Sequence, residues 1–185
     1  MCIRDRWRVG HIGVDSTFDQ VLNLNLTNAK ASASSIFNST APSSTLVTLG
    51  NEGDANGNNN TFVAYCFHSV QGYSKFGSYT GNGNADGTFI YTGFKPAWFL
   101  VKNTSISRDW QIFDDKRLGY NVDNNYLFAN LSDAEGTADR VDLLSNGFKW
   151  RTSANTYNAS GNNYIYMAFA ENPFVSSSGV PATAR

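Results

Sequence analysis

The chain contains an internal repeat, and this repeat restricts the possible folds more than any other feature of the sequence. Residues 60–69 and 162–171 align without a gap at an offset of 102 residues. Two shorter pairs of blocks match in the same order at offsets of 103 and 105 residues, namely residues 7–9 with 110–112 and residues 26–30 with 131–135. Self-similarity at a nearly constant spacing predicts one structural unit that occurs twice.

The second copy of the unit has a front part that the first copy lacks. This front part spans residues 73–103, and its counterpart would precede Trp7. The expected division is residues 1–6 as an adaptor-derived artefact, 7–70 as the back part of a truncated first repeat, 71–174 as a complete second repeat, and 175–185 as a C-terminal tail. We expect the first repeat to pack on the complete one. The alternative is that a partner chain supplies the missing strands, which would make the protein a homo-oligomer.

Short apolar segments, rich in β-branched and aromatic residues and bounded by Gly, Asn or Pro, predict strands. The predicted strands are residues 74–80, 89–92, 97–101, 110–113, 126–130, 141–144, 147–151 and 163–170. The continuous apolar run at 97–101 is typical of a strand covered on both faces. Asn-Gly pairs predict tight turns at residues 82–83 and 146–147. The density of strands and turns predicts an all-β fold, a β-sandwich of the jelly-roll or Ig type.

One segment, residues 131–139, has the pattern of a helical turn or two. Ser132 is the expected N-cap, and Glu135 stands three residues later as its partner.

The charge balance argues against nucleic acid and membranes as partners. The formal net charge is -1 and only 16% of the residues are charged, so an anionic phosphate backbone or lipid surface meets no basic patch. No apolar run approaches the roughly 18 residues that a transmembrane helix requires. We therefore expect neither nucleic-acid binding nor membrane insertion.

The residues that usually perform catalysis are sparse. The two histidines are His11 and His68, and no nucleophile elbow, phosphate loop or zinc motif is present. Cys66 lies two residues before His68, where strand spacing would separate the two by about 7 Å, and we expect Cys66 to be a buried, inert thiol. Asp114 and Asp115 are followed by Lys116 and Arg117, which indicates a solvated turn with local ion pairs. We predict that the protein is not an enzyme and has no catalytic residue.

Two segments crowd oxygen-bearing side chains and glycines as calcium loops do, residues 50–58 and 81–87. Their charged members are Glu52, Asp54 and Asp86, and neither segment has the ligand spacing of an EF-hand. We expect hairpin turns at both places. A structural Ca²⁺ is the alternative, and we expect no other cofactor.

Exposed aromatic rings can stack on the apolar face of a sugar. Trp150, flanked by Lys149 and Arg151, is the first candidate for such a ligand-binding residue, and Tyr120 and Tyr157 in loops are the others. For the tryptophans as a group we expect core packing, because Trp98 lies in the apolar run and Trp7 and Trp110 occupy equivalent positions of the repeat. The polar loops at residues 50–60, 81–87 and 155–162 are the candidate recognition surface, because binding residues concentrate on loops held by a rigid scaffold.

Several blocks taken together resemble a known tandem-repeat domain. They are residues 73–83 (Tyr-Ser-Lys-Phe-Gly-Ser-Tyr-Thr-Gly-Asn-Gly), 93–98, 144–149, 158–161, 164–171 and 181–185. The domain that they resemble recurs at the C-terminal end of tail-fibre-like and other virion proteins of marine bacteriophages. The resemblance covers nearly all of the chain after residue 6, and it carries over no catalytic or binding residues.

This resemblance implies a non-enzymatic virion structural module in a tail fibre or surface appendage, with a role in host-surface adhesion. The implied partners are other virion proteins and a host cell-surface glycan. The alternatives are a carbohydrate-binding β-sandwich domain of a bacterium or prophage, an accessory domain of a phage depolymerase, and a capsid decoration protein.

Overall fold

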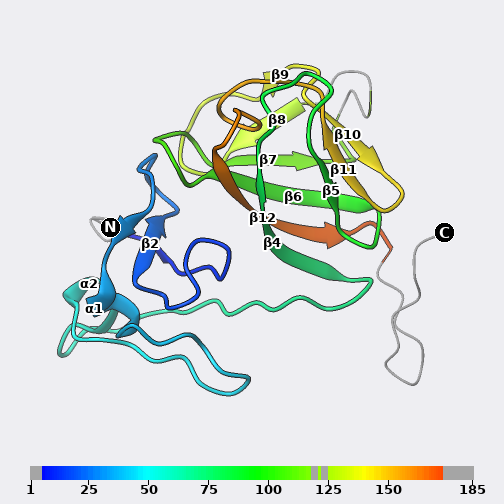
Figure 1. The fold of residues 1–185 in the computed structure, drawn as a ribbon. Coiled ribbons are helices and arrows are strands. Elements are labelled where there is room, and N and C mark those ends of the chain that lie inside the picture. The colour runs from blue at the N-terminus through cyan, green and yellow to red at the C-terminus, as the bar shows by residue number, and fades with distance from the viewer. Residues whose placement is uncertain (1–5, 118–120, 122–124, 173–185) are drawn as a thin grey trace, which may run out of the picture.

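A computed structural model of the chain describes residues 6–117, 121 and 125–172, and the regular secondary structure of these residues is almost entirely antiparallel β (Figure 1). The elements are β1 (Arg8–Val9), β2 (Gln20–Asn23), β3 (Ala31–Ser32), α1 (Ser34–Phe37), α2 (Gly53–Asn56), β4 (Ser74–Thr80), β5 (Phe89–Tyr91), β6 (Pro96–Asn103), β7 (Gln111–Asp114), β8 (Asn125–Phe128), β9 (Gly136–Thr137), β10 (Val141–Leu144), β11 (Gly147–Trp150) and β12 (Asn163–Ala170). In this described part no helix is long and apolar enough to cross a membrane.

The largest sheet has six strands in the order β4-β12-β6-β7-β8-β9, and all neighbours are antiparallel. The last strand in sequence, β12, lies inside this sheet between β4 and β6. Tyr166, for example, pairs with Gly77 on one side and with Val101 on the other. Because β12 is hydrogen-bonded along both edges, it joins the front and the end of the second repeat into one sheet.

A three-stranded sheet, ordered β10-β11-β5, covers one face of the six-stranded sheet and completes a β-sandwich. The core between them is mostly aromatic, and rings from both sheets stack within it. Phe99 on β6 stacks on Phe148 of β11 at 4.3 Å between centroids and on Phe113 of β7 at 5.0 Å. This core confirms the predicted all-β, sandwich-like fold.

Alternation along the strands gives the six-stranded sheet a second buried face. On β6, Phe99 and Val101 point into the sandwich core, whereas Leu100 points to the opposite side. There it packs with Val14 and Leu22 from the first repeat. Residues of the first repeat therefore form a third layer, as expected for a first repeat that packs on the complete one, and β6 is covered on both faces as predicted.

The small sheet β1-β2-β3 has the same register as β7-β8-β9, shifted along the sequence by the repeat. Four pairs in the first sheet, Arg8 with Asn23, Val9 with Leu22, Gln20 with Ser32 and Val21 with Ala31, match Gln111 with Phe128, Ile112 with Leu127, Asn125 with Thr137 and Tyr126 with Gly136. The two copies also share a cap: Asn25 Oδ1 accepts from the Trp7 amide, and Asn130 Oδ1 from the Trp110 amide. The repeated blocks of sequence thus adopt the same backbone pairing at these positions.

Two of the sequence-based expectations about elements are wrong. Residues 131–139 form no helix; they are extended and contribute β9, which pairs with β8. A structural unit that occurs twice would give residues 60–69 the same structure as residues 162–171, but residues 60–69 form no strand and are exposed throughout. Figure 1 shows this segment as an extended stretch of coil that leads to β4.

Candidate ligand-binding face

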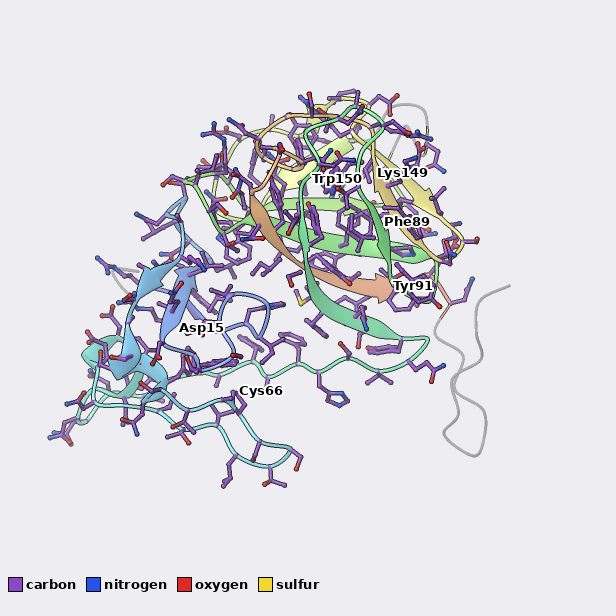
Figure 2. All side chains as sticks on the ribbon, viewed as in Figure 1. Asp15, Cys66, Phe89, Tyr91, Lys149 and Trp150 are labelled. Atoms are coloured by element: carbon purple, nitrogen blue, oxygen red, sulfur yellow. The ribbon has the colours of Figure 1, made fainter. Side chains whose placement is uncertain are left out.

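The outer face of the sheet β10-β11-β5 carries two exposed aromatic rings side by side. Phe89 and Tyr91 on β5 flank the buried Ile90, so both point outward, with 43% and 64% of their surface exposed. Residues two apart on one strand stand about 7 Å from each other on the same face. Figure 2 shows the two side chains on the outer side of the sandwich.

Cross-strand neighbours extend this face over the whole sheet. Its outward positions are Asp142, Lys149 and Phe89 in one row and Leu144, Gly147 and Tyr91 in the next. Gly147 in the second row is buried, and a Cβ at that position would lie 3.1 Å from the Phe89 ring and 2.0 Å from the Ile90 carbonyl oxygen. The absence of a side chain there lets β5 and the Phe89 ring approach the backbone of β11 closely.

Charged groups form one rim of this face. Lys149 Nζ lies 2.6 Å from Asp86 Oδ1, and Arg151 pairs with both Asp86 and Asp142. The hydrogen bond and charge of Lys149 lower the pKa of Asp86, so this carboxylate is ionised at neutral pH. Such exposed ion pairs add little stability, but they present donors and acceptors beside the rings.

The loop that carries Asp86 is held by a buried asparagine. Asn158 is fully buried, and its amide donates to Asn82 Oδ1 at 2.7 Å, to the Asn84 carbonyl at 2.8 Å and to the Thr152 carbonyl at 3.0 Å. Its side-chain oxygen accepts from the backbone N–H of Asn82 and from the Thr88 hydroxyl. Two of the predicted recognition loops, residues 81–87 and 155–162, are therefore one rigid unit, and residues 50–60 lie apart from it in the first repeat (Figure 1).

The structure places the sequence-predicted ring residues elsewhere. Trp150 is fully buried at the centre of the sandwich core, and Tyr157 is 3% exposed and packs against it at 4.8 Å between ring centroids. The prediction that these rings are offered to a ligand is wrong, because Trp150 points inward from β11 while its neighbour Lys149 points outward. Tyr120 lies outside the described residues.

The three predicted metal ligands do not come together. Glu52 accepts a hydrogen bond from Ser35, Asp54 pairs with Arg8 at 2.7 Å, and Asp86 belongs to the rim of the outer face. Within the described part of the chain, no three His, Cys, Asp or Glu side chains are grouped as a metal site requires. Each of the three carboxylates instead has a protein partner.

Two predictions about single residues have opposite outcomes. Cys66 was expected to be buried, but it is a free, exposed thiol on the extended segment (Figure 2). The predicted local ion pairs of the Asp114 turn are confirmed, since Asp114 pairs with Arg117 and Asp115 with Lys116.

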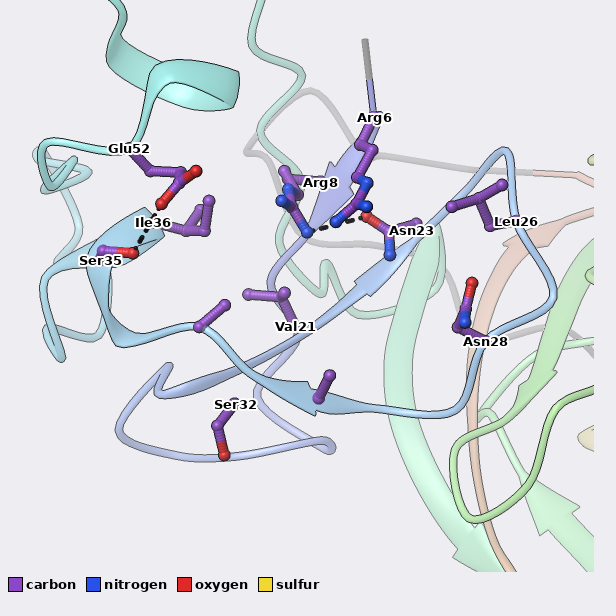
Figure 3. A pocket seen from close by; sticks show the side chains of 12 residues that line it. Arg6, Arg8, Val21, Asn23, Leu26, Asn28, Ser32, Ser35, Ile36 and Glu52 are labelled. Atoms are coloured by element: carbon purple, nitrogen blue, oxygen red, sulfur yellow. Dashed lines mark hydrogen bonds between the residues drawn. The ribbon is translucent and has the colours of Figure 1, made fainter. Parts of the chain in front are cut away.

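A separate pocket of about 340 Å³ lies in the first repeat, between the sheet β1-β2-β3 and α1 (Figure 3). Its charged lining residues are Arg6, Arg8 and Glu52. Two of these already have partners, because Arg8 bonds to Asp54 and Asn23, and Glu52 bonds to Ser35. The outer face is thus the better candidate for ligand binding, since its rings are exposed and lie on paired strands.

Sequence reasoning missed Phe89 and Tyr91. The signal that points to them is the alternation of residues 89–91 beside Gly93, in which two rings flank a single aliphatic residue. That pattern allows either the rings or the isoleucine to face the core, and only the pairing of Ile90 with Phe148 in the sandwich decides it.

Comparison with known proteins yields one family. The family described as "Domain of unknown function (DUF7483)" matches residues 2–173, which span both copies of the repeat and include most of the segment at 1–6 that was interpreted as an artefact. No curated protein and no solved structure matches the chain.

Proposed function

The chain belongs to the DUF7483 family of domains, and we propose that it is a non-enzymatic structural module of a bacteriophage virion that adheres to carbohydrate on the host surface. Its place in the particle would be a tail fibre or an equivalent surface appendage. The observation that carries the adhesive part of this proposal is the exposed pair Phe89 and Tyr91 on the outer face of a paired sheet.

The chemistry of this face suits a saccharide. An aromatic ring is large, flat and apolar, so it packs against the C–H face of a sugar, and the burial of both surfaces is favourable. Asp86, Lys149 and Arg151 stand beside the rings and can exchange hydrogen bonds with hydroxyl groups. Because β5 and β11 hold the backbone, little conformational entropy is lost on binding.

The virion placement is supported by the resemblance to tail-fibre-like proteins and by the duplicated strand motif. Units that repeat along a chain stack on their neighbours and build long, rigid assemblies. In this chain the first repeat already covers the back face of the six-stranded sheet, where Leu22 packs with Leu100.

The adhesive role is tested with immobilised bacterial lipopolysaccharides and capsular oligosaccharides. We expect the wild-type chain to bind a subset of them, and Phe89→Ala and Tyr91→Ala each to weaken the best binder by about tenfold, which corresponds to about 1.4 kcal/mol. Isothermal titration with that saccharide gives the affinity of each variant.

The matched control is Tyr73→Ala. Tyr73 is exposed to the same extent as Phe89, at 43%, but lies against Phe169 on a different part of the molecule. If Tyr73→Ala weakens binding as much as Phe89→Ala does, or if the wild type binds none of the saccharides, the adhesive role of this face is refuted.

Placement in the virion requires a separate experiment, since a bacterial or prophage carbohydrate-binding domain could use the same face. Gold-labelled antibodies against the chain should mark the tail or its fibres on virus particles concentrated from seawater. Label on the capsid surface would favour a decoration protein, and particles that carry the gene but no label would contradict the virion role. An accessory role in a depolymerase would be recognised by polysaccharide cleavage in the labelled appendage.

A further inference from the structure

Residues 61–69 repeat the sequence of β12 but not its structure. In the described part of the chain no strand pairs with them, and the four large apolar residues are exposed. Their exposed fractions are 41% for Phe62, 72% for Val63, 69% for Tyr65 and 57% for Phe67. The Ser74 hydroxyl donates to the His68 carbonyl at one end of the segment, but no described strand pairs with its backbone, and an extended apolar segment of this kind is a template for pairing with further strands.

The complete repeat shows what such a segment pairs with. β12 lies between β4 and β6, and its residues Tyr164, Ile165 and Ala168 are at most 3% exposed. The residues at the same positions in the first repeat are Phe62, Val63 and Cys66, at the offset of 102 residues. The second segment is therefore buried because a strand lies on each side of it, and the first segment is exposed because it has neither strand.

The first repeat has a second open edge that needs one of the same strands. β7 pairs with β6 on one side and with β8 on the other. Its counterpart β1 pairs with β2, and among the described residues no strand lies on its other edge. In the complete unit β6 lies between β7 and β12. Their counterparts, β1 and residues 61–69, therefore lack the same strand, an equivalent of β6.

We propose that residues 61–69 and the outer edge of β1 together form a docking site for the front part of a further repeat unit, which inserts strands equivalent to β4 and β6. The occupant is a front part joined ahead of Trp7, because in the complete unit β6 ends at Asn103 and Trp110 follows after a short loop. The inserted β6 equivalent lies between β1 and residues 61–69. This surface is distinct from the aromatic face of β5, so this inference goes beyond the proposed function.

The aromatic contacts of the first repeat fit a site that lacks its central strand. Trp7 and Tyr65 stack directly, with ring centroids 6.4 Å apart. In a completed sheet their strands would be second neighbours, about 9.6 Å apart, with a strand between them. Docking therefore separates this pair and places both rings against the inserted strand.

Cys66 reports on the docking directly. Its thiol is exposed in this chain, whereas the equivalent Ala168 is fully buried in the complete repeat. The test protein carries a copy of residues 71–109 fused directly ahead of Trp7, which also removes Cys2. Labelling by a maleimide is compared with that of the full chain carrying Cys2→Ser. We expect labelling of Cys66 to slow at least tenfold in the fusion.

Two variants control this experiment. In a Cys66→Ser background, Ser132→Cys places a thiol on an exposed loop outside the docking site, and its labelling should be equal in both proteins. A fusion whose added copy carries Val101→Asp should leave Cys66 fully reactive, since the altered residue lies on the inserted strand. Equal labelling of Cys66 in the fusion and the unfused chain overturns the proposal. So does protection of Cys66 in the unfused chain on raising its concentration, because a second copy would then be the occupant.

Discussion

At the scale of single residues, burial of a charge links the first repeat to the second. Lys102 on β6 is fully buried, and its ammonium donates to the Thr27 carbonyl at 3.1 Å and to the Asn103 carbonyl at 2.8 Å. Burial disfavours the charged form and lowers the pKa of Lys102 to about 8, although the nearby Asp109 acts in the opposite direction. Formation of the contact with Thr27 requires desolvation of this amine, which costs free energy.

This lowered pKa predicts how stability depends on pH. Between the folded pKa of about 8 and the ordinary value of 10.5, the unfolded chain binds more protons than the folded chain. The contribution of Lys102 to the free energy of unfolding therefore rises with pH across this window. We expect urea unfolding of the wild type to show such a rise between pH 7.5 and 9, and Lys102→Met to remove it.

The exposed Lys75→Met is the control for this measurement, and it should keep the wild-type pH profile. A Lys102→Met profile as steep as that of the wild type would mean that Lys102 is not the group that titrates.

Predictions of individual binding-site residues failed where the sequence does not show whether a side chain points into the core or out to solvent. Trp150 and Lys149 are neighbours on β11, and the sequence identifies the strand but not which of the two faces the core. The core position of Trp150 depends on its contacts with Phe99 and Phe113, which lie more than thirty residues away in sequence. Phe89 and Tyr91 were missed for the same reason.

At the scale of elements, the two copies of the three-stranded motif share register and capping but differ in burial. Asn130 accepts from the Trp110 amide at 2.9 Å and also donates to Asp109, and Trp110 is 3% exposed. Asn25 makes the equivalent bond to the amide of Trp7, whose side chain is 47% exposed. The same hydrogen bond is thus partly buried in one copy and exposed in the other.

From this difference we expect unequal costs for the same substitution. Asn130→Ala should reduce the free energy of unfolding by about 1–2 kcal/mol, because it leaves partly buried donors and acceptors unpaired. Asn25→Ala should cost less than half as much, since water can replace the lost oxygen. Chemical denaturation of both variants measures this, and an equal or larger effect of Asn25→Ala would contradict the stronger shielding of the Asn130 cap from water.

Most strands were predictable because short aromatic and β-branched segments between turn residues rarely form any other secondary structure. Residues 74–80, 141–144 and 163–170 match β4, β10 and β12 without a shift.

The helix expected at residues 131–139 was not found. There Glu135 does not cap a helix; it bonds to Arg117 and Asn125, and the backbone that follows pairs with β8. Tertiary partners outweighed a local capping pattern.

At the scale of the whole molecule, one sheet lies between two others. The six-stranded sheet buries aromatic residues on the side of β10-β11-β5, and on the opposite side it packs Leu100 and Ile165 against the first repeat. The repeat in the sequence predicted two related units. It did not predict that residues 60–69 and 162–171 would differ in environment, because equal sequence ensures equal structure only when the flanking strands are also present.

These two similar segments differ in structure because only β12 has strands on both sides. Hydrogen–deuterium exchange with mass spectrometry on the full chain tests it, since amides in a paired inner strand exchange slowly and unpaired amides exchange fast. We predict strong protection for residues 163–170 and exchange near the unprotected rate for residues 61–68. Equal protection of the two segments would show that residues 61–68 are already paired, and would contradict a difference caused by missing flanking strands.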